Sequence, residues 1–311
     1  MATLTARISL KGDEPDGPED YLSTSLGVIF PDDIVNQHGD AEHSLLYASP
    51  KLPKTLLIEL ADPEGETDRR LFSHYLWNAS LLLAELIERD SLDDDEGEKQ
   101  DRGLGGDISF DTRGLHTLEL GAGTALPSIM AGLLGAAGVV VTDYPAPAVM
   151  KTLRENVARN IKPDLAPVGK SSLVTTSILV EGHEWGVFDS SSSAFPSSHA
   201  HLSDRLFVAD CLWMPWQHEN LRRSIGYFLK KTAEARAWVV AGFHTGRAKM
   251  APFFDAKALR EEGGVEVERM WERDCDGVER EWDSEREDDI TERKRWLVVC
   301  VLKRCEGMVD V

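Results

Sequence analysis

From about residue 115 onward, short apolar runs alternate with longer amphipathic segments. Residues 138–143, GVVVTD, have the length and β-branched content of a buried strand, whereas residues 147–160, PAVMKTLRENVARN, have the apolar spacing of a helix. Strands separated by helices pair in parallel, and a parallel sheet is covered by helices on both faces. The alternation therefore predicts an α/β, Rossmann-like fold built on a mostly parallel sheet.

Seven strands are expected in this sheet. They span residues 115–120, 138–143, 171–180, 204–213, 236–243, 265–271 and 293–304. The helices expected between and before them span residues 69–90, 125–136, 147–160, 218–233 and 251–263. Only the charged segment 272–294 joins the last two strands, so we expect the last strand to be antiparallel.

The chain before this sheet has a different character. Residues 12–20, GDEPDGPED, are rich in acids and helix breakers and predict a flexible leader. The segments YLSTSLGVIF and KTLLIEL resemble short strands or extended arms. We therefore divide the chain into an N-terminal extension, residues 1–68, and one α/β domain, residues 69–305.

The chain of 311 residues is acidic, with a formal net charge of -20 and a pI of about 4.8. An acidic field repels the phosphate backbone, so a nucleic-acid partner is not expected, whereas a cationic substrate would be attracted. The four cysteines lack the spacing of a metal site or a disulfide framework, which favours free thiols in a reducing compartment.

Membrane association is not expected either. No apolar run approaches the roughly 20 residues that span a bilayer, and the first residues lack the apolar core of a signal peptide. We expect a cytoplasmic protein and, because no exposed apolar helix is left over, a monomer.

Two carboxylates end adjacent predicted strands. Glu119 precedes the turn Gly121-Ala-Gly123, and Asp143 ends the next strand. In a doubly wound sheet, ligands bind beyond the carboxyl ends of the strands, and an acid at the end of the second strand takes ribose hydroxyls. Glycines in the first turn permit close approach of a ligand.

The same stretch excludes other nucleotide sites. Leu126 and Pro127 stand where the third glycine of a dinucleotide fingerprint would be, and the chain has no P-loop motif. It also has no H-E-x-x-H or G-x-S-x-G motif, and no metal site is expected. A nucleoside that carries an amino acid and a positive charge, S-adenosylmethionine, fits the two acids best.

At this point the sequence resembles a known family. The segments LELGAGTALPSI, VTDYP and LRENVARN are similar to the core of the seven-β-strand methyltransferases, and more narrowly to the fungal branch of family 16. That branch is called nicotinamide N-methyltransferase-like and includes an enzyme that methylates the N-terminus and a lysine of elongation factor 1-alpha. The resemblance covers about residues 70–302.

The resemblance implies further cofactor-binding and substrate residues. Trp77 matches a tryptophan that borders the cofactor, Tyr144 lies in the matching TDYP turn, and Trp185 falls where the family stacks a tryptophan on adenine. Plain packing is the alternative for Trp77, and an exposed loop tryptophan without a function is the alternative for Trp185. Asp210 lies where the family places an aspartate over the methyl group, and Trp213 replaces the family's Tyr or Phe three residues later.

Two later segments could meet the substrate. His244 and Arg247 follow the fifth predicted strand, where His244 could accept a proton and Arg247 could hold an oxygen. A structural loop histidine and a surface ion pair are the alternatives. Arg280 and Trp282 lie in the last predicted hairpin, and we expect Trp282 to belong to a substrate lid.

The resemblance thus implies an enzyme, an S-adenosylmethionine-dependent N-methyltransferase that releases S-adenosylhomocysteine. Its acceptor is expected to be a protein amine, a lysine or an N-terminus, such as one in a translation factor. The alternative is a small-molecule N-methyltransferase acting on nicotinamide or a secondary metabolite. A catalytically inactive binder is the third reading, which the intact Glu119, Gly121, Gly123, Asp143 and Asp210 disfavour.

Overall fold

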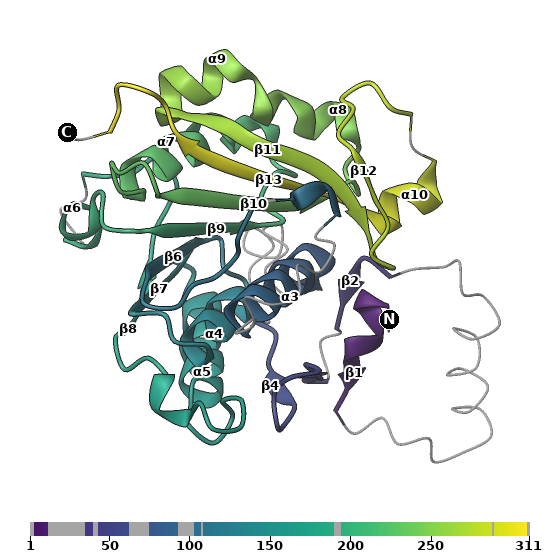
Figure 1. The fold of residues 1–311 in the computed structure, drawn as a ribbon, viewed down its shortest axis with the longest axis vertical. Helices are drawn as coiled ribbons and strands as arrows, with labels where there is room; N and C mark the ends of the chain where they lie inside the picture. Colours follow the sequence, from purple (N-terminus) through teal and green to yellow (C-terminus); the bar gives the residue numbers. More distant parts are fainter. Residues whose placement is uncertain are drawn as a thin grey trace.

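The computed structural model describes residues 3–11, 35–39, 43–61, 75–92, 103–106, 108–189, 194–287 and 289–309. The leader at 12–20 and the segment YLSTSLGVIF lie outside the described residues. Within them, a sheet of eight strands in the order β12-β11-β13-β10-β9-β6-β7-β8 forms the centre of the molecule (Figure 1).

The central strands are parallel, as the sequence predicts. β6 (His116–Leu120) lies between β7 (Gly138–Asp143) and β9 (Arg205–Ala209), and β8 (Ile178–Gly182) and β10 (Arg236–Gly242) flank this trio. The chain runs outward from β6 through β7 to β8 and then returns to β9, so the strand order reverses between β6 and β9. A ligand crevice is expected at this reversal.

The last strands close the sheet in antiparallel fashion. β13 (Trp296–Arg304) inserts between β10 and β11 (Val265–Asp274) and runs antiparallel to both. This confirms the expected antiparallel last strand. An eighth strand, β12 (Glu279–Glu281), pairs with the end of β11 and was not expected, because three charged residues carry no apolar signal.

Helices cover both faces of the sheet. On one face lie α3 (Asn78–Leu92), α4 (Leu126–Leu133) and α5 (Pro147–Asn160). On the other lies α7 (His218–Phe228). Short helical segments occur before and after α7 in the chain. These segments are α6 (Phe195–His199), α8 (Arg247–Met250), α9 (Ala256–Ala258) and α10 (Ile290–Arg295).

Alternate residues of each central strand enter the two cores. In β10, Val239 packs on the α7 side and Val240 packs on the α3 side, and both are fully buried. Strands covered on both faces have few polar positions, which explains why these segments read as mostly apolar runs. The expected helix at 251–263 is instead broken, because Asp255 caps a new helical start by accepting from the Ala258 amide at 2.8 Å.

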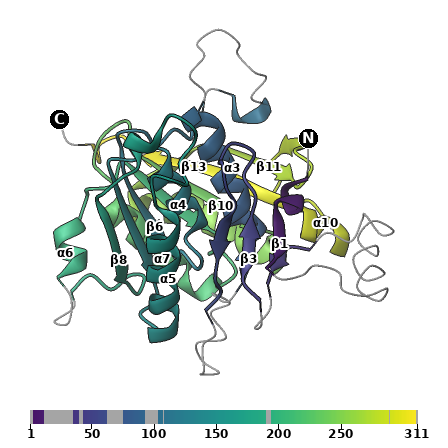
Figure 2. The ribbon, with the colours of Figure 1, turned by 90° about the horizontal axis from the view of Figure 1, so that it is seen from below.

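The described part of the N-terminal extension packs against the same domain. β1 (Ile8–Leu10), β3 (Leu45–Tyr47) and β4 (Leu56–Ile58) form a small antiparallel sheet on the α3 side, seen in Figure 2. The inward side chains Leu45 and Tyr47 are fully buried in the core that contains α3.

A second N-terminal segment supports the ligand crevice. β2 (Gln37–His38) pairs antiparallel with β5 (Leu76–Trp77), which leads directly into α3. Buried Asn78 fixes this pair, because its Oδ1 lies 2.7 Å from Nε2 of His38 and its Nδ2 donates to the Val35 carbonyl at 2.9 Å. The extension therefore holds Trp77 in place.

Asn78→Ala should reduce the free energy of unfolding by about 1–3 kcal/mol, because it leaves His38 buried without this partner. Urea unfolding measures the loss. The matched control is Asn220→Ala, since the Asn220 side chain donates to Gln217 near the surface, and we expect about 0.5–1 kcal/mol there. Equal effects at the two positions would contradict the bracing role of Asn78.

Candidate active site

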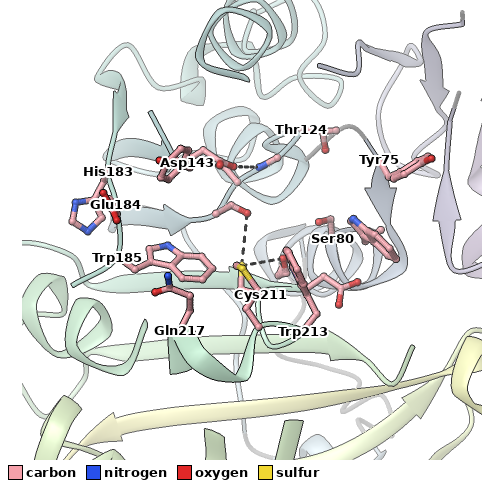
Figure 3. Close-up of a pocket in the computed structure, with 18 residues that line it drawn as sticks. Tyr75, Ser80, Thr124, Asp143, His183, Glu184, Trp185, Cys211, Trp213 and Gln217 are labelled. Carbon is pink, nitrogen blue, oxygen red and sulfur yellow. Dashed lines mark hydrogen bonds between the residues drawn. The ribbon is translucent and has the colours of Figure 1, made fainter. Parts of the chain in front are cut away.

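A pocket opens at the carboxyl ends of the parallel strands, next to the reversal of strand order. It encloses about 860 Å³ of empty space, its open mouth included. Its walls come from β5, the turns after β6, β7 and β8, and the segment after β9. Figure 3 shows Trp185 and Trp213 on either side of Cys211, with Asp143 and Thr124 across the pocket.

The turn after β6 packs closely against Cys211 and Trp185 of the pocket wall. Gly121 has φ of +69°, and a Cβ there would lie 2.7 Å from Cys211 Sγ and 2.9 Å from the Trp185 ring. Gly123 has φ of +53°, and a Cβ there would meet nothing within 4 Å, so its bare backbone faces open space. Both positions therefore need glycine for their conformation, and Gly121 also needs it for space.

Asp143 fixes this turn. Its Oδ2 accepts from the Gly123 amide and its Oδ1 accepts from the Tyr144 amide, both at 2.7 Å. Burial raises the pKa of Asp143 to about 6, and the two backbone hydrogen bonds oppose that rise. Asp143 lines the pocket, and Tyr144 stands beside it with 40% of its surface exposed.

Glu119 lies beneath the turn and is fully buried. Its Oε2 accepts from the Ser128 amide of α4 at 3.2 Å, and it is not among the residues of the described pocket wall. Burial raises the pKa of Glu119 to about 8, and the nearby charge of Asp143 adds to the rise. In this structure Glu119 joins β6 to α4. The turn after β6, and not Glu119 itself, lines the pocket.

Asp210 follows β9 in a left-handed conformation with φ of +59°, which aspartate tolerates better than most residues. Its amide donates to the Val240 carbonyl at 2.8 Å, and its Oδ1 accepts from the Gly242 amide at 3.2 Å. Burial raises the pKa of Asp210, and neighbouring His244 opposes the rise. The carboxylate is thereby aimed into the pocket from the fourth predicted strand.

His244 and Trp77 form a stacked pair beside Asp210. The rings are 4.6 Å apart and tilted by 22°, and Nδ1 of His244 lies 3.8 Å from Oδ1 of Asp210. Trp77 lines the pocket, whereas His244 stands behind it. The stacked rings of Trp77 and His244 thus connect the β2–β5 pair to the Asp210 carboxylate.

Arg247 and Trp282 occupy a different place. Arg247 is 4% exposed and makes two hydrogen bonds to Glu272, at 2.6 and 3.2 Å, and its guanidinium lies over Phe243 and Trp282. Arg280 also donates to Glu272, at 2.7 Å. None of these residues belongs to the described pocket wall. Their contacts instead join the loop after β10 to the last hairpin.

Several wall residues carry no motif of their own. They are Tyr75, Ser80, Thr124, His183, Met214 and Gln217. The sequence indicates these wall residues only by their nearness to others, because each lies within seven residues of a predicted site residue. Burial lowers the pKa of His183 to about 4, so this wall residue is neutral at physiological pH.

The wall fits S-adenosylmethionine. Asp143 offers oxygens to a ribose, Trp185 and Trp77 offer flat aromatic faces, and the bare Gly123 backbone lets a ligand approach. Two carboxyl groups, Asp143 and Asp210, line the pocket, and their ionised forms favour a cationic ligand. Fold and site together define an S-adenosylmethionine-dependent methyltransferase.

Comparison with known proteins narrows this class. A family model described as lysine methyltransferase, methyltransferase family 16, matches residues 65–258, which is more than half of the chain. This chain therefore belongs to methyltransferase family 16.

Curated relatives bear the same kind of name. The protein N-terminal and lysine N-methyltransferase EFM7 of Gibberella zeae is 30% identical over 210 residues, which cover 66% of this chain and 70% of the relative. The proteins of that name from Aspergillus fumigatus and Schizosaccharomyces pombe are 29% and 28% identical, covering 67% and 65% of this chain and 70% and 68% of their own.

Solved structures agree in fold. A Streptococcus mutans protein described as a SAM-dependent methyltransferase has a TM-score of 0.51 at 11% identity, covering 92% of this chain and 65% of its own. A second structure, described as a methyltransferase complexed with SAH, has a TM-score of 0.50 at 12% identity, covering the same shares of the two chains. At such identities the likeness concerns the fold alone.

The affinity for S-adenosylhomocysteine should depend on the ionisation of Asp143. Ribose hydroxyls donate to the ionised carboxylate, so affinity should be constant above about pH 7 and fall as pH drops through about 6. Calorimetric titration between pH 8 and pH 5 measures this. Asp143→Asn should bind weakly with a flat profile, while Glu119→Gln should keep the transition near pH 6. A wild-type affinity that is unchanged at pH 5 would contradict this role.

Glu272→Gln should strongly destabilise the fold. The fully buried carboxylate receives hydrogen bonds from Arg247, Arg280 and Arg286, and the buried charge of Arg247 loses its counterion. Removing one member of such a group costs about 3–5 kcal/mol, measured by urea unfolding. Glu281→Gln is the matched control, because Glu281 is exposed and should contribute under about 1 kcal/mol. A loss under about 1 kcal/mol for Glu272→Gln would refute the account.

Proposed function

We propose that this chain transfers methyl groups from S-adenosylmethionine to a protein amine, a lysine side chain or an N-terminus. The observation that carries the proposal is Asp210, a buried carboxylate with a raised pKa that lines the same pocket as Trp77 and Trp213. The names of the curated relatives support a protein acceptor over a small molecule.

The form of the pocket supports the same choice. A closed lid would favour a small acceptor, yet Trp282 packs against Phe243 and Phe254, with ring centroids 6.1 and 5.6 Å apart, and the described pocket wall does not include it. Trp213 and Met214 form the wall instead and are half-buried. A side chain of another protein can enter such an open site.

In the proposed reaction, residues of the pocket hold the cofactor and receive the amine. S-adenosylmethionine, when bound, supplies a methyl group activated by the sulfonium charge. Asp143 and Trp185 hold its nucleoside, while Trp77 and Tyr144 border it. An amine is protonated at neutral pH, with a pKa of about 10.4 for lysine, and must lose a proton before it can attack.

Asp210 is the proposed proton acceptor. Burial favours the neutral form of its carboxyl group, the Gly242 amide and His244 contact its Oδ1, and the residue lines the pocket. The Trp213 face favours a cationic amine on the approach to the site. His244 and Arg247 act in the proposal by fixing the loop after β10, and Trp282 acts through its contact with Arg247.

We also propose that the protein works in the cytoplasm, which its four free, buried cysteines support. In the part of the chain that the structure describes, no helix has the length and apolar character needed to cross a bilayer.

Transfer of labelled methyl groups tests the function. S-adenosylmethionine labelled in its methyl group is given to the enzyme with a demethylated lysate, with purified elongation factor 1-alpha and, separately, with nicotinamide analogues. We expect label on a protein, and mass spectrometry should place it on a lysine or a terminal amine. Label in the small-molecule fraction alone would contradict the proposal.

Asp210→Asn should reduce methyl transfer by about 100-fold or more, because general-base catalysis contributes on that scale. Asparagine tolerates the left-handed backbone, so S-adenosylhomocysteine affinity should stay within a few-fold. Single-turnover rates and calorimetry measure the two quantities. Val168→Ala is the control, since Val168 is exposed in the connection between α5 and β8, at the opposite edge of the sheet. Full activity in Asp210→Asn would remove Asp210 from the reaction.

A further inference from the structure

Trp216 is an exposed tryptophan beside the mouth of the pocket. It has 71% of its surface exposed, although its neighbours Met214 and Gln217 line the pocket. Its ring meets that of Trp213 edge to face, at 6.4 Å between centroids and 90°. Trp213 points into the pocket, as Figure 3 shows, so the two rings form a continuous aromatic path from the site to the surface.

The segment that carries Trp216 is held rigidly. Pro215 begins a single 3-10 turn, Pro215–Gln217, in which the Gln217 amide donates to the Met214 carbonyl at 2.9 Å. His218 Nε2 lies 2.9 Å from the Leu212 carbonyl oxygen and closes the loop from the other end. An aromatic side chain carried on a fixed backbone segment binds a partner without the entropy cost of ordering that segment, which suits a binding anchor.

Exposed aromatic side chains gather at this rim. Among the described residues, the exposed aromatic side chains of large size are Trp216 and Tyr144, and Tyr144 lines the same pocket. Val187, 41% exposed, follows the Trp185 turn on the adjoining wall. Single exposed apolar residues are ordinary, but a group around a pocket mouth marks a binding surface.

Acidic residues accompany these apolar ones. Glu184 is exposed and lines the pocket, and Glu219 is exposed in the first turn of α7, three residues after Trp216. The two segments lie together, because the Gly186 amide donates to Ser224 Oγ of α7 at 2.9 Å. Arg223 of the same helix lies over the ring of Phe188, 5.6 Å from its centroid.

We propose that Trp216, with Glu184 and Glu219, binds a cationic segment of the acceptor protein that flanks the methylated amine. A lysine or arginine side chain of that segment lies on the Trp216 face, and the two carboxylates attract it from solution. This inference rests on the proposed function, since it concerns the acceptor of the same site. It assigns Trp213 to the reacting amine and Trp216 to the adjoining residues.

A fluorescent peptide tests the proposal directly. The probe is a short peptide of lysine and arginine among small residues, titrated by anisotropy with enzyme saturated in S-adenosylhomocysteine, beside a peptide with glutamine in place of each basic residue. Trp216→Ala should weaken binding of the cationic peptide roughly 5- to 30-fold, whereas Trp216→Phe should retain most of it. Glu184→Gln and Glu219→Gln should each weaken it about twofold, an effect that high salt removes.

Kinetics on the protein acceptor give the second measurement. Trp216→Ala should raise KM for that protein and leave kcat and cofactor affinity unchanged, and Val168→Ala should change neither. Equal binding of the cationic and glutamine peptides, or an affinity that does not depend on Trp216, would overturn the inference. Trp216-dependent peptide binding without any protein methylation would instead refute the proposed function and leave the docking surface standing.

Discussion

The parallel pairing of β6 with β7 and β9 is the constraint on which the site depends. Because the three strands run in the same direction, their carboxyl ends meet at one edge, and the turn after β6 comes to lie against Cys211 and Trp185. Gly121 makes this approach possible, since a Cβ there would overlap both neighbours. Asp143 then fixes the turn by accepting from the Gly123 amide.

The consequence is a set of acids held in unequal surroundings. Glu119 is sealed beneath the turn, and its raised pKa, about 8, keeps it largely neutral at pH 7. Asp143, with a pKa of about 6, is largely ionised there and lines the pocket. Asp210 lines the same pocket. One edge of a sheet thus supplies a structural acid, an acid that we propose binds the cofactor and an acid that we propose accepts the proton, distinguished by burial and by hydrogen bonds.

The sheet could be predicted from the sequence because its strands are buried on both faces. The strand at 138–143 and the helix at 147–160 have the predicted bounds, since apolar periodicity and the proline at the helix start mark both. β12 and the β2–β5 pair escaped prediction, because strands of two or three residues are defined by their partners rather than by their own composition. The third strand begins at Ile178 and not at 171, where three serine-rich residues form a 3-10 turn.

For the site, local motifs placed Gly121, Gly123 and Asp143 at one strand edge, where the structure also has them. Contacts between distant segments lay beyond sequence reasoning. The stacking of His244 on Trp77 joins segments 167 residues apart, and the buried Arg247–Glu272 pair depends on how the last hairpin folds back. Trp216 carried no motif, and its exposure became visible only with the fold.

The most direct measurement of the account is a crystal structure with S-adenosylhomocysteine. The account predicts ribose hydroxyls on Asp143, adenine beside Trp185, and the sulfur turned toward Asp210 and Trp213. A ribose bound away from Asp143, or a sulfur facing away from Asp210, would contradict the assignment of the site.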